Sequence, residues 1–383
     1  MAGPLTGIKV VDLSRILAGP WATQVLADFG AEVIKIERPQ LGDDTRRWGP
    51  PYFKNEQTGA EISAYFLAAN RGKSSVELDF TNDAGKQVLF ELLNGADILV
   101  ENYKVGGLKK YGLDYDSLKQ QFPSLIYCSI TGFGQTGPDA AQAGYDAMIQ
   151  ARGGLMSITG SPQTGPQKVG VAVTDLMTGM YAATAIIAAL HHKTQTGQGQ
   201  QIDLALLDCQ AAMLANQGSN YLVSGNAPKP MGNSHPNIVP YQSFAVKNGH
   251  ILLAVGNDAQ FGRCCEVMGL DSLAQHPDYV TNDKRVANRD RLIAIMQPQF
   301  LSKNLDQWLT DLSQNDVPCG PINTLDRVFS DKQLQSRSML LELEHAELGK
   351  VPLVANPVKF SGTPLEYPKA PPMLGEDNGL ISN

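Results

Sequence analysis

The chain has 383 residues, which predicts two or three domains and leaves ample length for a buried core. Charged residues make up 18% of the chain and apolar residues 43%, which excludes disorder of the chain as a whole. The net charge of −7 argues against nucleic acid or an anionic membrane as the partner. Small molecules or proteins remain as partners.

Cysteine and histidine spacing predicts neither disulfides nor a metal site. The five cysteines are odd in number and scattered, and no Cys or His spacing is typical of a zinc site. The first residues, MAGPLTGIKVVDL, lack a basic segment followed by an apolar stretch, and the final ISN is not a sorting signal. We therefore expect a reducing compartment and a cytoplasmic protein.

The first 130 residues alternate strand-like and helix-like runs. Strands are predicted at residues 8–13, 31–37, 75–80, 97–102 and 125–130, and helices at about 20–29, 86–93 and 115–122. Strands separated by helical crossovers form a parallel sheet that is covered on both faces. The pattern predicts a doubly wound, Rossmann-like α/β domain.

The rest of the chain predicts a second, smaller domain. A helix from Asp175 to about Leu190, a strand at 200–206 and a helix to about Val223 complete the large domain, and residues 225–240 have the composition of a linker. An Asn-Gly hairpin signal at 247–249 and helical patterns at 282–296 and 305–312 then indicate an α+β domain. The predicted boundaries are 1–224 for the large domain, 225–325 for the linker and small domain, and 326–383 for a segment returning to the large domain.

A glycine-rich segment follows the strand predicted at 125–130. Gly132-Phe133-Gly134-Gln135-Thr136-Gly137 matches G-x-G-x-x-G, but Pro138 follows it and it does not occupy the first βα turn. It therefore fits a loop where the backbone turns or approaches a ligand better than a nicotinamide site. No GxSxG or HExxH motif is present, so serine-hydrolase and zinc-hydrolase functions are disfavoured.

Asp175 is a lone carboxylate in apolar surroundings. It is the only residue charged at neutral pH among the 24 between Lys168 and Lys193, a stretch more typical of a buried helix in a soluble protein than of a membrane span. The structural interpretation is a helix N-cap. The functional one is a carboxylate kept ionised by the helix dipole yet poorly hydrated, which is a nucleophile suited to attack on a thioester.

Eight segments, in order, resemble one known family over essentially the whole chain. These segments are similar to the class III CoA-transferases, which include formyl-CoA and carnitine CoA-transferases and also α-methylacyl-CoA racemases. They are LTGIKVVDLSRILAGPWATQVLADFGAEVIKIERP, GDDTR, ENY, the glycine-rich segment 132–137, YDAMIQARGG, VGVAVTDLMTGMYAA, GNSHP and VPCGPIN. The resemblance implies an interlocked-ring homodimer that uses acyl-CoA and small carboxylic acids as substrates and needs no metal.

The resemblance also implies roles for individual residues. Asp175 would carry the acyl group and then CoA covalently. Tyr145 matches the position of the racemases' histidine, and the amide of Gly256 is a candidate oxyanion donor. The residues matched to CoA binding are Ile16, Leu17, Ala18, Arg38, Leu78, Asn102, Tyr103 and Lys110.

Three departures from the family pattern bear on specificity. Leu17 stands where the oxalate-using enzymes carry Gln, their glycine flap is reduced to Gly256-Asn257-Asp258, and Ala143 replaces a basic residue. These differences argue against specificity for oxalate, and the expected acceptor is a small carboxylic acid, such as the dicarboxylates oxalate, succinate and glutarate. Residues 46–48, Arg-Arg-Trp, line the pocket or serve the fold; the sequence leaves both open.

Two alternatives to CoA transfer remain at this stage. One is racemase-type proton transfer, which is disfavoured because a tyrosine, with an ordinary pKa near 10, is a poor base at neutral pH. The other is a CoA-binding protein without turnover.

Overall fold

The computed structural model describes residues 3–381, and the chain divides into two compact units. The first unit contains the chain up to Leu155, the segment Lys168–Ala215, and the chain from Lys332 onward. The second contains Met156–Gln167 and Asn216–Asp331.

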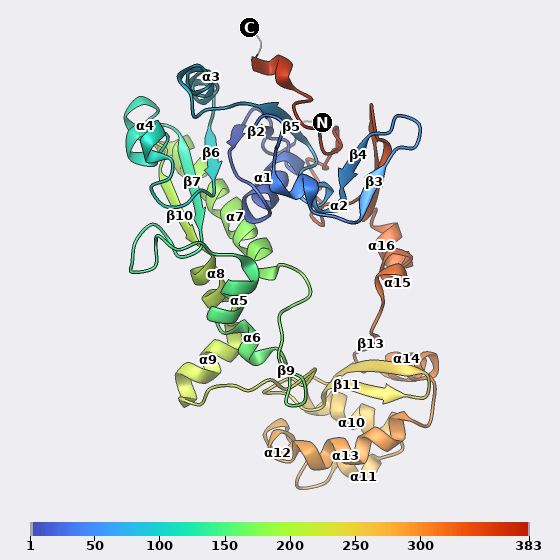
Figure 1. Ribbon diagram of the computed structural model, residues 1–383. Helices are drawn as coiled ribbons and strands as arrows, with labels where there is room; N and C mark the ends of the chain where they lie inside the picture. Colours follow the sequence, from blue (N-terminus) through green and yellow to red (C-terminus); the bar gives the residue numbers. More distant parts are fainter. Residues whose placement is uncertain (1–2, 382–383) are drawn as a thin grey trace. The chain divides into compact units, whose positions relative to one another are not determined.

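A six-stranded parallel sheet forms the centre of the first unit (Figure 1). Its strand order is β10-β7-β6-β1-β2-β5, so β1 lies between β2 and β6 and the order reverses there. The bounds are β1 (Lys9–Asp12), β2 (Glu32–Glu37), β5 (Lys73–Glu77), β6 (Ile98–Glu101), β7 (Ile126–Thr131) and β10 (Gln201–Ala205). The predicted parallel α/β sheet is confirmed, and each predicted strand is present within a few residues.

Helices cover both faces of this sheet. Since neighbouring residues of a strand point to opposite faces, they pack against different helices. Val10 belongs to the cluster formed with α1 (Ala18–Asp28) and α7 (Val173–Thr196). Val11 belongs to the cluster formed with α3 (Asp83–Asn94) and α4 (Tyr115–Gln121). Strand β6 is buried along its whole length as a result.

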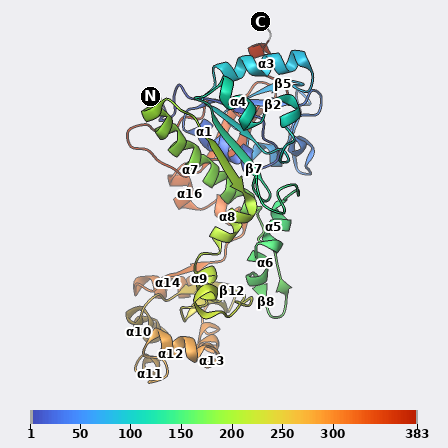
Figure 2. The ribbon, with the colours of Figure 1, turned by 90° about the vertical axis from the view of Figure 1, so that its left-hand side faces the viewer.

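The bounds of the long helix α7 correct two predictions, namely that Asp175 is the N-cap of this helix and that the helix ends near Leu190. It begins at Val173 and ends at Thr196, where Gly197 takes a left-handed conformation with φ 73°. Asp175 is therefore a residue of the first turn and not the N-cap. Length and composition would allow α7 to cross a membrane, but its buried residues pack against α1 in the core of the first unit. Figure 2 shows α7 in green along its length.

Beyond β10, the single long helix expected to reach Val223 is instead two helices. α8 (Leu206–Met213) ends before Ala215, whose φ of 44° interrupts the helical path, and α9 (Ala215–Ser224) follows.

In the second unit, the hairpin predicted at residues 247–249 is confirmed. β11 (Tyr241–Val246) pairs antiparallel with β12 (Gly249–Ala254), and β13 (Cys319–Pro321) pairs with β12. Helices pack on this sheet around a core that includes Phe244, Phe300 and Trp308. The helices are α10 (Asp258–Val267), α11 (Asp271–Ala274), α12 (Asn282–Ala287), α13 (Arg289–Phe300) and α14 (Leu305–Gln314), and α15 (Leu325–Phe329) follows β13 along the chain.

The C-terminal segment joins the first unit. The Asp377 amide donates to the Ser75 carbonyl of β5 (2.9 Å), and the Ser75 amide donates to the Asp377 carboxylate (2.9 Å). The remaining elements are short: η1 (Asp44–Arg47), β3 (Tyr52–Lys54), β4 (Glu61–Ser63), α2 (Ala64–Leu67), η2 (Lys109–Tyr111), α5 (Asp146–Arg152), α6 (Leu155–Ile158), β8 (Gly160–Ser161), β9 (Gly165–Pro166), α16 (Lys332–Ser336), β14 (Leu340–His345), β15 (Gly349–Val354) and η3 (Asn378–Ile381).

Candidate active site

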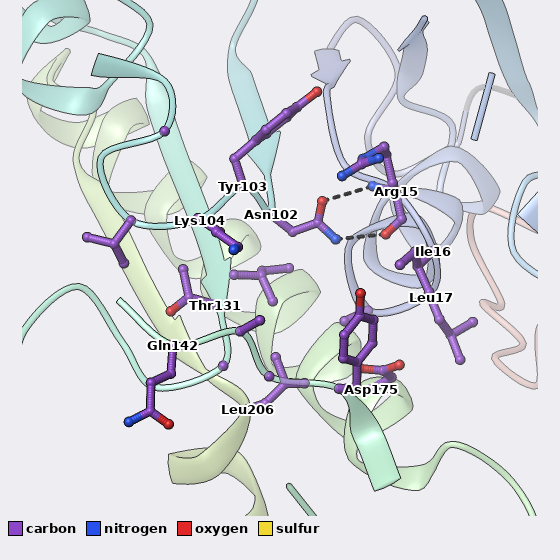
Figure 3. A pocket seen from close by; sticks show the side chains of 18 of the residues that line it. Arg15, Ile16, Leu17, Asn102, Tyr103, Lys104, Thr131, Gln142, Asp175 and Leu206 are labelled. Carbon is purple, nitrogen blue, oxygen red and sulfur yellow. Dashed lines mark hydrogen bonds between the residues drawn. The ribbon is translucent and has the colours of Figure 1, made fainter. Parts of the chain in front are cut away.

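A cavity of about 410 Å³ lies in the first unit, where β1, β6 and β7 end (Figure 3). Parallel sheets place ligand sites at the carboxyl ends of their strands, where the strand order reverses, and this volume is typical of such sites. Seven of the residues predicted for the site line the cavity: Ile16, Leu17, Ala18, Asn102, Tyr103, Tyr145 and Asp175.

Asp175 reaches the cavity from the first turn of α7 and is half-buried. The N-terminus of that helix is capped by Asp146, the first residue of α5. The Asp146 carboxylate accepts hydrogen bonds from the amides of Thr174 (2.8 Å) and Asp175 (3.3 Å). Asp146 thus does what the sequence interpretation assigned to Asp175, and the Asp175 carboxylate remains available to the cavity.

Burial and, to a smaller extent, the nearby Asp146 carboxylate together raise the pKa of Asp175 to about 7. The sequence interpretation expected the helix dipole to keep Asp175 ionised. Because desolvation and a like charge oppose ionisation, comparable populations of the acid and the carboxylate are expected at neutral pH. A basic carboxylate of this kind is a stronger nucleophile whenever it is ionised.

The loop after β1 is fixed to the loop after β6 by one side chain. The Asn102 carboxamide accepts from the Arg15 amide (2.9 Å) and donates to the Arg15 carbonyl (2.7 Å), as the dashed lines in Figure 3 show. Both loops line the cavity, so this pair of bonds sets their separation.

Four predicted residues do not line this cavity. Arg38 donates to the Asp44 carboxylate (3.1 Å), Leu78 is buried in a core cluster, and the Lys110 ammonium lies 4.6 Å from the centre of the Tyr111 ring. The fourth, Gly256, belongs to the second unit, where its amide donates to the Gln260 side chain (2.7 Å). Their roles in binding or catalysis stay predictions.

Arg46 and Trp48 serve the fold. The Arg46 guanidinium is paired with the buried Glu37 carboxylate (2.6 Å), and the Trp48 ring packs edge-on against Tyr65. Neither side chain lines the cavity described here.

Sequence reasoning missed several residues of the cavity. Two cations, Arg15 and Lys104, line it beside the predicted neighbours Ile16 and Tyr103, as do Thr131, Gln142 and Leu206 (Figure 3). Arg15 and Lys104 are each adjacent in sequence to a predicted site residue, and this adjacency was the signal that could have identified them.

The glycine-rich segment has a packing explanation. A Cβ on Gly132 would lie 2.6 Å from the backbone of Gly144, so the two ends of the loop between β7 and α5 meet through backbone alone. Within residues 3–381, no group of three His, Cys, Asp or Glu side chains is placed to hold a metal ion.

The chain belongs to the family described as CoA-transferase family III, whose model matches residues 5–378. It is 49% identical over 378 residues to the succinate–glutarate CoA-transferase of Agrobacterium fabrum, covering 99% of this chain and 94% of that one. It is 43% identical to the human succinyl-CoA:glutarate CoA-transferase, covering 97% and 84% of the respective chains. The protein is an enzyme that transfers CoA between acyl-CoA and carboxylates.

A solved structure agrees with this assignment. The crystal structure of a CAIB/BAIF family protein from Brucella suis matches with a TM-score of 0.88 and 48% identity, and the match covers 100% of this chain and 99% of that one.

Proposed function

We propose that this enzyme moves CoA between small dicarboxylic acids, with Asp175 as the covalent nucleophile. The observation that carries the proposal is that Asp175 has the one carboxylate among the described residues lining the cavity. Burial leaves that group poorly hydrated, and the cap from Asp146 fixes the helix turn that carries it.

Four balanced steps follow from an attacking carboxylate. An Asp175 oxygen attacks the thioester carbonyl carbon, and the C–S bond breaks. CoA departs as the thiolate, and the product on the enzyme is an acyl-aspartyl anhydride. The thiolate attacks the aspartyl carbonyl carbon and releases the donor acid, leaving an aspartyl-CoA thioester. The acceptor carboxylate displaces the thiolate to form a second anhydride. The thiolate then attacks the acceptor's acyl carbon, which forms the new acyl-CoA and restores Asp175.

Each tetrahedral stage needs hydrogen-bond donors for the oxyanion. We propose the Gly256 amide and the Tyr145 hydroxyl for this role. Tyr145 lines the cavity with Asp175, which supports its part, and the Gly256 amide would have to exchange its bond to Gln260 for one to the substrate.

We propose that CoA enters along the loops after β1 and β6. The backbone of residues 16–18 and the Asn102 and Tyr103 side chains line the cavity, and Arg15 and Lys104 add positive charge there. Guanidinium and ammonium groups suit phosphates, which also motivates Arg38 and Lys110 as contacts outside the cavity. An aromatic ring such as that of Tyr103 can stack on adenine.

Succinate and glutarate are the proposed acids. The names of the Agrobacterium and human relatives support this choice, as does Leu17, an apolar side chain on the cavity wall where the oxalate-using enzymes have Gln.

We further propose a cytoplasmic, interlocked homodimer whose protomer consists of a large and a small domain. Large apolar side chains remain exposed on α7 and on α9, including Tyr181, Leu222 and Val223, and exposed apolar groups of this kind typically mark association surfaces. Light scattering after gel filtration should give twice the 41.3 kDa chain mass.

Trapping tests the covalent route. Mixing the enzyme with succinyl-CoA and then borohydride or hydroxylamine should modify the peptide containing Asp175, as read by mass spectrometry. Asp175→Asn should reduce exchange by about 10³-fold or more. Asp203→Asn, a carboxylate outside the cavity, is the control. An active enzyme with an unmodified Asp175 would contradict the covalent route.

A further inference from the structure

The cavity wall after β1 adopts a strained backbone. Ile16 has φ 72°, a left-handed conformation that is unfavourable for a β-branched residue. Its neighbours Arg15 and Leu17 line the cavity with it. Such strain persists only where the surroundings fix the backbone, so the contacts of this loop reveal what sets its shape.

Side chains from distant parts of the chain hold this backbone. Besides the two bonds from Asn102 to Arg15, the Lys35 ammonium of β2 donates to the Ser14 carbonyl (2.8 Å). The Ile16 amide donates to both oxygens of the Asp43 carboxylate, each at 3.2 Å.

Lys35 and Asp43 also bind each other. Their charged atoms lie 2.9 Å apart, and both side chains are fully buried. They lie under the loop and do not line the cavity. Each residue of the pair forms one hydrogen bond to the other and at least one to the loop backbone. The pair therefore fixes the two peptide groups that flank Arg15.

A second buried pair supports the same loop. The Asp12 carboxylate at the end of β1 accepts from the Ser14 amide (2.9 Å) and is paired with the buried Lys73 ammonium (3.2 Å). Burial away from water lowers the pKa of the Lys73 ammonium to about 8. The loop therefore rests on charged groups that are held rigidly in the sheet.

We infer that the buried Lys35–Asp43 pair is a positioning device for acyl-CoA: it holds the strained Ser14–Leu17 backbone in the shape that binds the thioester substrate. This inference rests on the proposed function, because the loop is assigned there to CoA. Lys35 and Asp43 are positioning residues and touch no reacting atom. When the cavity wall already has its bound conformation, binding does not have to order that loop, and the entropic cost of binding is smaller.

The test replaces the pair by apolar residues of similar size. Removing one partner would leave a buried charge unpaired, whereas replacing both is often neutral for stability. Lys35→Met/Asp43→Leu should therefore fold, with a melting temperature a few degrees lower because the Ser14 carbonyl and the Ile16 amide lose their side-chain partners. Its matched control is Arg71→Met/Asp28→Leu, which removes another buried pair of the same unit, with side chains 7% and 1% exposed, that does not line the cavity.

Two readouts separate positioning from simple stability. Amide hydrogen exchange at residues 14–17 should be about tenfold faster in Lys35→Met/Asp43→Leu and unchanged in the control. The KM for succinyl-CoA and the calorimetric Kd for CoA should rise about tenfold, with kcat changed less than about threefold. Equal behaviour of the two double variants, or wild-type exchange and affinity in the first, would overturn the inference.

A second variant covers a failure to fold. Lys35→Met/Asp43→Asn removes both charges, so that no buried charge is left unpaired, and keeps one oxygen for the Ile16 amide; it should weaken CoA binding about threefold with faster exchange at Ile16. Wild-type values for both would also overturn the inference. Hydrogen exchange and CoA binding require no turnover, so an enzyme that fails to exchange acids would refute the proposed function without deciding this inference.

Discussion

Asp175→Asn should stabilise the protein, and by an amount that grows with pH. The native pKa of Asp175 is raised from 3.8 to about 7, so the unfolded chain releases this proton first. Between these two values the native state binds more protons than the unfolded state, and stability falls as pH rises. The penalty is absent below about pH 4 and is complete above about pH 7. An asparagine at this position never ionises and escapes it.

The full shift corresponds to roughly 4 kcal/mol. Because the Asp175 side chain is only half-buried, solvent screens part of it, and a gain of about 1–3 kcal/mol is expected above pH 7.5. The stability difference between Asp175→Asn and wild type should be about 1 kcal/mol larger at pH 8.5 than at pH 5.5.

Urea unfolding at both pH values and at one fixed protein concentration measures this difference. Concentration must be fixed because association contributes to apparent stability. Asp79→Asn is the control: Asp79 is exposed, and hydrogen bonds from Thr81 lower its pKa. A difference between Asp175→Asn and wild type that stays constant or shrinks with rising pH would refute the reasoning.

Two further predictions concern α7. Asp146→Asn keeps an acceptor for the Thr174 amide but removes the like charge beside Asp175, so the pKa of Asp175 should fall. The acidic limb of the pH–rate profile should then move to lower pH with little change in melting temperature; an unmoved limb would contradict this coupling. Gly179→Ala would place a Cβ 2.7 Å from the Ala18 carbonyl oxygen, so α1 and α7 must separate. Calorimetry should show a loss of about 1–3 kcal/mol, and an unchanged melting temperature would argue against close packing there.

Local patterns were sufficient to predict the parallel sheet. Apolar runs such as ILVE, closed by glycine or by a polar turn, predict strands wherever they occur, because burial on both faces requires continuous apolar sequence. The Asn-Gly hairpin after Val246 was also predictable from local sequence, because the conformation of the turn depends on the two turn residues themselves. Asp175 could also be selected as a candidate from the sequence, because a single charge in a long apolar stretch is visible without a structure, and the structure places it at the cavity.

The tertiary structure alone decided what surrounds those residues. Asp146 lies 29 residues before Asp175 and nevertheless caps its helix, and Asp43 reaches back 27 residues to hold the Ile16 amide. Such contacts depend on how loops return across the strand ends, and residue type or spacing does not encode that path. The candidate nucleophile is thus visible in the sequence, whereas its proton affinity and the shape of the pocket wall arise from groups that only folding brings together.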